Sequence, residues 1–194
     1  MILFGAGHSA GEKVYKGYNE DKAMFDLAER KARYAADRYG QKTKTFYMTG
    51  KTWDQVEAAC RGCRVASWEH SNAWEPGPSI DRVSVYRTVK NKGDGPCLLL
   101  GQATVKVLVA SYAEVKRNAN SAGNDGFGCI GRAMRAGCED SWLHEHSFHT
   151  NDRVRGLLSD PGIRQKLAEA EVDVLAAYYG WGDIMFAQRG QGTL

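Results

Sequence analysis

The first half of the chain alternates short apolar runs with longer amphipathic segments. Ile2 to Phe4 is an apolar run that ends at a glycine, which predicts a buried strand opening into a loop. Residues 20–39 carry apolar side chains at a spacing near 3.6, which predicts a helix that stops at Gly40. Period-two alternation or short apolar patterns predict further strands at 44–48, 64–70 and 82–88, and a short helix at 54–59.

In the second half, an apolar stripe over residues 98–117 predicts one long helix. An Asn- and Gly-rich loop is expected at 118–128, a strand at 142–148, and a last helix from Pro161 to Gly180. Residues 182–194 lack periodicity, so we expect a domain of residues 1–181 followed by a loose tail or the start of a linker. Strands alternating with helices predict an α/β fold: a single domain with a twisted, mostly parallel β-sheet flanked by helices on both faces.

Composition excludes several classes of protein. The chain has 194 residues, of which 43% are hydrophobic and 25% charged, so it is neither disordered nor fibrous. A net charge of +3 without a block of like charges gives no indication of nucleic-acid binding. No apolar run is long enough to span a bilayer, and the first residues read as a strand rather than a signal peptide. We therefore expect synthesis in the cytoplasm and no insertion into a membrane.

The five cysteines indicate a reducing compartment, because an odd number cannot pair completely. Cys60 and Cys63 have the spacing of a zinc knuckle, but no second Cys-x-x-Cys pair follows. We expect them to be free thiols.

Three side chains are candidates for a metal centre. His8 directly follows the first predicted strand, His70 ends the 64–70 strand, and Glu20 begins the long helix. If both strands lie in one parallel sheet, these groups meet at one edge, and two imidazoles with one carboxylate are a common catalytic zinc shell. The alternative is that each histidine is only a polar residue at a strand end. Glu145 lies inside an apolar strand, where a carboxylate is costly unless it has a partner or a catalytic role.

Four sequence segments resemble one enzyme family. They are Gly5-Ala-Gly-His8-Ser9, Gly17-Tyr-Asn-Glu20, Ser67-Trp-Glu-His70-Ser-Asn-Ala73 and Leu143-His-Glu145-His-Ser-Phe148-His-Thr-Asn151. In this order they resemble the motifs of the zinc-dependent N-acetylmuramoyl-L-alanine amidases of the amidase type 3 family, and the resemblance covers roughly residues 2–180. The match is poor between Asn118 and Asp140.

The resemblance implies a set of functional residues. His8, Glu20 and His70 would be the ligands of a zinc ion, Zn²⁺, and Glu145 the catalytic carboxylate. The substrate would be peptidoglycan, cleaved at the amide bond between N-acetylmuramic acid and the L-alanine of the stem peptide. Beside them, the resemblance and the spacing make His149, Asn72 and Trp74 candidates for the substrate cleft.

The final motif departs from the family pattern at two positions. His144 stands where the family is usually aliphatic, and Ser147 replaces a common glycine. In a strand, His144 and His146 point away from the face of Glu145, so we expect packed or solvent-bonded side chains rather than further ligands of the same metal.

The absence of a signal peptide favours a phage endolysin, a bacteriolytic enzyme made in the cytoplasm that reaches the cell wall after release. Two alternatives stay open. One is another zinc peptidase, such as a carboxypeptidase acting on the wall, with Arg82, Arg87 or Arg132 binding a substrate carboxylate. The other is a non-catalytic wall-binding domain of the same fold. Neither the peptidoglycan chemotype nor the oligomeric state is predicted.

Overall fold

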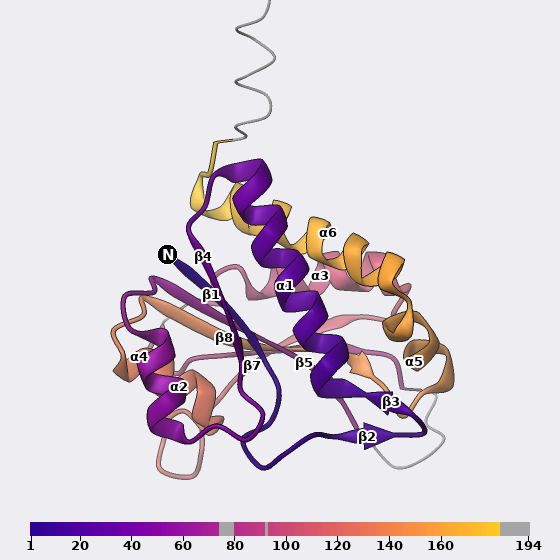
Figure 1. Cartoon of the computed structure of the whole chain (residues 1–194), viewed down its shortest axis with the longest axis horizontal. Helices are drawn as coiled ribbons and strands as arrows, with labels where there is room; N and C mark the ends of the chain where they lie inside the picture. The colour runs from indigo at the N-terminus through magenta and orange to yellow at the C-terminus, as the bar shows by residue number, and fades with distance from the viewer. Residues whose placement is uncertain (74–79, 92, 183–194) are drawn as a thin grey trace, which may run out of the picture.

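A six-stranded sheet forms the centre of the molecule, with strand order β4-β1-β5-β8-β6-β7 (Figure 1). The computed structural model describes residues 1–73, 80–91 and 93–182. The strands of the sheet are β1 (Ile2–Ala6), β4 (Thr43–Tyr47), β5 (Val65–Asn72), β6 (Val83–Arg87), β7 (Ala113–Arg117) and β8 (Asp140–Phe148). A separate two-stranded hairpin consists of β2 (Val14–Tyr15) and β3 (Tyr18–Asn19).

Helices cover both faces of the sheet. The long helices α1 (Glu20–Tyr39), α3 (Cys97–Leu108) and α6 (Pro161–Tyr179) pack together on one face, and α2 (Trp53–Cys60) and α4 (Gly128–Arg135) on the other (Figure 1). A further helix, α5 (Asp152–Ser159), precedes α6. This confirms the predicted single α/β domain with a mostly parallel sheet. Trp74, the turn at 75–79 and the tail at 183–194 lie outside the described residues.

The sequence pattern placed most elements correctly, and their ends have local causes. Asn19 caps α1 by accepting a hydrogen bond from the backbone N–H of Lys22, and Gly40 ends the helix in a left-handed conformation with φ of 61°. Gly180 ends α6 in the same way, with φ of 67°. The cap at Asn19 fixes Glu20 as the first helical residue, at the edge of the sheet.

The predicted helix over residues 98–117 is wrong in its second half. Helix α3 ends at Leu108, Val109 takes a left-handed conformation, and residues 113–117 form the edge strand β7 parallel to β6. The apolar stripe continues into β7 because Val115 packs against the same core as α3. Pairing with β6 therefore overrides the helical pattern. The sequence pattern also missed β2, β3, α4 and α5.

Strand direction decides which side chains can meet. Strands β1, β4, β5 and β8 are mutually parallel, whereas β6 pairs antiparallel with β8 and carries β7 parallel to itself. The carboxyl ends of β1, β5 and β8 therefore meet at one edge of the sheet, and those of β6 and β7 lie at the opposite edge. No helix within the described ranges is long and apolar enough to cross a membrane.

Two buried tryptophans fill the layers on either side of the sheet. Trp68 packs in the cluster beneath α2 and α4, and Trp142 in the cluster beneath α1, α3 and α6. Gly5 of β1 leaves room for the Trp68 ring, because a Cβ atom there would lie 2.6 Å from Trp68 Cζ3. That distance is well inside van der Waals contact, so the ring would have to move.

We therefore expect Gly5→Ala to lower the free energy of unfolding by about 1–3 kcal/mol through overpacking. Urea denaturation followed by tryptophan fluorescence measures this. Gly156→Ala in α5 is the matched control, since a Cβ there meets no atom within 4 Å and alanine favours a helix. Equal stability of Gly5→Ala and the wild type would show that the Trp68 ring can shift without cost.

Candidate metal centre

Three potential metal ligands converge at the edge where β1, β5 and β8 end. His8 lies in the loop after β1, His70 near the end of β5, and Glu20 in the first turn of α1. One ligand atom from each of these residues lies within 4.8 Å of the others. The His8 and His70 rings meet edge to face, with centroids 4.7 Å apart. The structure thus brings together the three residues that the sequence singled out.

His8 is held in one orientation by Asp21. Its Nδ1 lies 2.5 Å from Asp21 Oδ1, and Thr49 Oγ1 donates a 2.9 Å hydrogen bond to Asp21 Oδ2. Gly7 permits this approach, because it has φ of 105° and a Cβ there would collide with Thr49. His8 Nε2 is left facing Glu20 Oε1 at 3.7 Å. A histidine whose second nitrogen bonds a carboxylate is the usual arrangement of a metal ligand.

Glu20 is oriented from β5. The backbone N–H of Ser71 donates to Glu20 Oε1 at 3.1 Å, and His70 Nδ1 lies 3.2 Å from the same oxygen. Burial alone would raise the pKa of Glu20, but the His70 hydrogen bond and the positive potential of both histidines lower it overall. Glu20 is therefore a carboxylate at neutral pH.

The three residues suit a divalent cation. His70 Nε2 is buried and has no hydrogen-bond partner among the described residues, so the ring is only partly satisfied by protein atoms. Two imidazoles and one carboxylate match the ligand preference of Zn²⁺ and supply one negative charge. The hydrogen bond to Asp21 also raises the pKa of His8, against the lowering effect of burial.

Asp21→Asn is expected to weaken Zn²⁺ binding about 10- to 100-fold, because the His8 ring loses the carboxylate that orients it. Competition with a chromophoric zinc chelator gives the dissociation constant. Asp37→Asn, on the outer part of α1, serves as the control and should leave the constant unchanged. Equal affinities for Asp21→Asn and the wild type would show that Asp21 does not support the centre.

Glu145 lies beside this centre. It is half-buried on β8, directly opposite His70 in the register of β5 and β8. Burial, with a smaller contribution from the negative charge of Glu20, raises its pKa well above the usual range. Its Oε2 has no hydrogen-bond partner within the described part of the chain. The carboxyl group is therefore available to exchange a proton with a molecule in the cleft.

A cleft of about 370 Å³ opens over these groups. His8, Glu20 and Glu145 line it, together with the cleft candidates Asn72 and His149 and with residues Lys13 to Tyr15 at the start of the hairpin. His149 Nδ1 lies 3.0 Å from Ser71 Oγ, and burial lowers the pKa of His149. The sequence analysis identified neither Asp21 nor the β2–β3 hairpin as part of the site. The only sequence signal for Asp21 was its position next to the predicted ligand Glu20.

None of the three arginines considered for binding a substrate carboxylate lines this cleft. Arg82 pairs with Glu114, Arg87 with Asp94, and Arg132 with Asp54 and Glu57. The arrangement therefore gives no support to the carboxypeptidase alternative.

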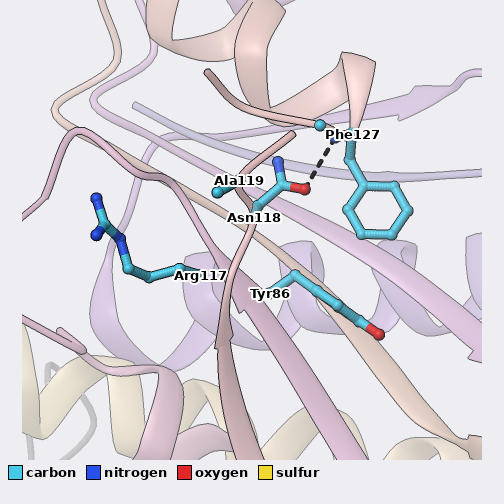
Figure 2. Close-up of a pocket in the computed structure, with 6 residues that line it drawn as sticks. Tyr86, Arg117, Asn118, Ala119 and Phe127 are labelled. Atoms are coloured by element: carbon cyan, nitrogen blue, oxygen red, sulfur yellow. Dashed lines mark hydrogen bonds between the residues drawn. The ribbon is translucent and has the colours of Figure 1, made fainter. Parts of the chain in front are cut away.

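A second hollow of about 260 Å³ lies beyond the carboxyl ends of β6 and β7, at the opposite edge of the sheet (Figure 2). Its walls include Tyr86 and Phe127, whose rings meet edge to face, and Arg117. Asn118 Oδ1 accepts a hydrogen bond from the Phe127 N–H, which fixes the loop around it. Among the described residues, no carboxylate, histidine or cysteine lines this hollow, so they offer it none of the usual metal ligands.

No sequence-family model and no curated protein sequence matches the chain. Solved structures do match its fold. The CwlD amidase of Clostridioides difficile, solved in complex with the GerS lipoprotein, superimposes with a TM-score of 0.73 at 16% identity over 92% of this chain and 98% of that chain. Ami1, an N-acetylmuramyl-L-alanine amidase of Mycobacterium smegmatis, gives 0.66 at 19% identity over 93% and 97%.

A third structure agrees with these two. The catalytic domain of CwlV, an N-acetylmuramoyl-L-alanine amidase of Bacillus (Paenibacillus) polymyxa, gives a TM-score of 0.67 at 12% identity over 93% of this chain and 98% of that domain. The chain therefore has the fold of the N-acetylmuramoyl-L-alanine amidases over nearly its whole length.

Proposed function

We propose that this chain is a zinc-dependent N-acetylmuramoyl-L-alanine amidase. It would hydrolyse the amide bond that joins the lactyl group of N-acetylmuramic acid to the L-alanine of the peptidoglycan stem peptide. The observation that carries the proposal is the convergence of His8, Glu20 and His70 beside Glu145, in a cleft of a fold shared with such amidases.

Each side chain has a defined part in the proposed reaction. His8, Glu20 and His70 would hold the metal. A Zn²⁺ ion bound there supplies Lewis acidity, which polarises the amide carbonyl and makes water a better nucleophile at neutral pH. Glu145 accepts a proton from the attacking water and passes it to the departing amine of L-alanine. A carboxyl group whose pKa is raised by burial is suited to hold that proton between the two transfers.

The cleft walls would hold the substrate on either side of the scissile bond. Asn72 offers an amide that can both donate and accept hydrogen bonds, which matches the peptide groups of the stem. His149 is fixed by Ser71 and lies between the sheet and the hairpin, with its ring centroid 5.5 Å from that of Tyr18. We propose that both residues orient the stem peptide.

The experiment that tests the function combines metal analysis with product analysis. The purified chain should contain about one Zn²⁺, solubilise purified cell walls, lose activity to a chelator and regain it with Zn²⁺. Mass spectrometry of the digest should show free L-alanine amino termini on intact stem peptides. Release of a terminal amino acid would instead identify a carboxypeptidase, and wall binding without any product would identify a non-catalytic domain.

The endolysin role stays a prediction. Expression inside bacteria followed by permeabilisation of the membrane is the direct test. Lysis by the wild type, but not by a variant lacking Glu145, is the expected result.

A further inference from the structure

Behind the candidate metal centre lies a cluster of charged side chains sealed inside the protein. We call it the buried charge cluster: Lys31 of α1, Glu69 of β5, His144 and His146 of β8, and Glu171 of α6. Each of these residues is at most 1% exposed. The cluster therefore connects β5 and β8, the strands of His70 and Glu145, to helices α1 and α6.

Lys31 places a cation between the two carboxylates. Its Nζ lies 2.6 Å from Glu69 Oε2 and also contacts Glu171 Oε2. Glu69, His144, His146 and Glu171 together have the spacing of a metal site, but the Lys31 ammonium bonds both carboxylates. We therefore interpret the cluster as an internal ion-pair network rather than a second metal centre.

His146 connects this network to His70. Its Nδ1 lies 3.0 Å from the backbone oxygen of His70, and its Nε2 lies 3.0 Å from Glu171 Oε1. A carbonyl oxygen can only accept, so Nδ1 donates to His70. Thr104 Oγ1 also donates to Glu171 Oε1, at 2.7 Å, which holds that carboxylate in place. The imidazole ring is thus fixed at both ends.

The bond to the His70 carbonyl stands where the sheet is irregular. The register of β5 and β8 shifts between His70 and Asn72, and Ser147 takes a left-handed conformation with φ of 65°. Pairing resumes at Asn72 and Phe148. A register shift leaves backbone groups without their regular ladder partners, and a side-chain donor can replace the missing one.

We propose that His146 is a positioning residue for the metal ligand His70, acting through the hydrogen bond from its Nδ1 to the His70 carbonyl oxygen. Glu171 holds the imidazole at its other nitrogen, and Lys31 pairs with Glu171. This inference rests on the proposed function, since it takes His70 as a ligand of Zn²⁺. It gives His146 a role at the metal centre, although its side chain was predicted to point away from the face of Glu145.

Two amide variants separate the two ends of the ring. In His146→Asn the side-chain nitrogen stands near the position of Nδ1 and can still donate to the His70 carbonyl. In His146→Gln it stands near the position of Nε2 and can donate only toward Glu171. The zinc dissociation constant and the visible absorption of the Co²⁺-substituted protein are measured for both. His144→Gln, in the same cluster but without a contact to His70, is the control for general loss of packing.

We expect His146→Gln to weaken Zn²⁺ binding about 10- to 100-fold and to alter the Co²⁺ spectrum, with His146→Asn close to the wild type. Equal constants and spectra for the two variants would overturn the inference while leaving the proposed function intact. A wild-type chain that binds no metal would instead remove the proposed function, and this inference with it.

An NMR measurement on the wild-type chain keeps the inference testable if the variants do not fold. The Nδ1–H proton of His146 should appear as a slowly exchanging signal with through-hydrogen-bond coupling to the His70 carbonyl carbon. A His146 ring whose Nδ1 carries no proton would overturn the inference.

Discussion

Glu145→Gln is expected to lower kcat about 10²- to 10⁴-fold, the usual contribution of a general acid–base group. Glutamine keeps the size of the side chain and can still form hydrogen bonds, but it cannot take a proton from water. The metal ligands are untouched, so zinc content and KM should change little. The loss should therefore appear in the chemical step alone.

The rate at which free L-alanine amino termini form in purified walls gives the turnover, and metal analysis of the same samples gives the zinc content. Glu139→Gln is the control, since Glu139 lies in an exposed pair with Arg64 just before β8. A Glu145→Gln protein that turns over like the wild type would show that Glu145 is not the proton carrier. Loss of zinc in this variant would show that it helps to hold the metal.

The candidate site could be predicted from the sequence because the ends of parallel strands lie at the same edge of a sheet. Where a buried strand ends, a polar residue such as His8 or His70 is placed at the edge of the sheet, and both strands run in the same direction. The start of the long helix at Glu20 was predicted from the helical spacing of its apolar residues, and the structure begins α1 at this residue. For these residues the local sequence pattern predicts the same position that the folded structure gives them.

The parts that were missed depend on partners distant in the sequence. Edge strand β7 exists because it pairs with β6, and nothing local distinguishes Val115 from a helical position. The hairpin wall of the cleft consists of two-residue strands, too short to produce a pattern. The antiparallel direction of β6 follows from its pairing with β8 and not from its own residues.

Lys31 is a charged residue at a buried position of α1, and the sequence alone does not show why. It falls on the inner stripe of α1 with Leu27, Ala28 and Ala35, all of which are buried. A lysine at such a position indicates either a break in the stripe or a buried partner. Glu69 and Glu171, which lie 38 and 140 residues further along the chain, only become its partners in the folded structure.

Lys31→Met is expected to lower the free energy of unfolding by about 3–5 kcal/mol. Methionine fills a similar volume, so the main effect is electrostatic: Glu69 and Glu171 stay buried without their ammonium. In the wild type these carboxylates raise the pKa of Lys31 although burial alone would lower it, and Lys31 helps to lower the pKa of Glu171 against the effect of burial. Urea denaturation measures the loss, and Lys106→Met on the exposed side of α3 should change stability by less than about 0.5 kcal/mol.

The direction of the pH dependence follows from the charge left behind. Without Lys31 a buried carboxyl group has a higher pKa in the folded than in the unfolded chain, so protonation stabilises the folded variant. The deficit of Lys31→Met should therefore be smaller near about pH 5 than near about pH 8, growing as the pH rises through the folded pKa. Adding Glu69→Gln removes one negative charge while its Oε1 can still accept the hydrogen bond from Ser67, so the double variant should recover part of the loss. A Lys31→Met protein with wild-type stability at both pH values would show that the burial of Glu69 and Glu171 does not depend on the Lys31 ammonium.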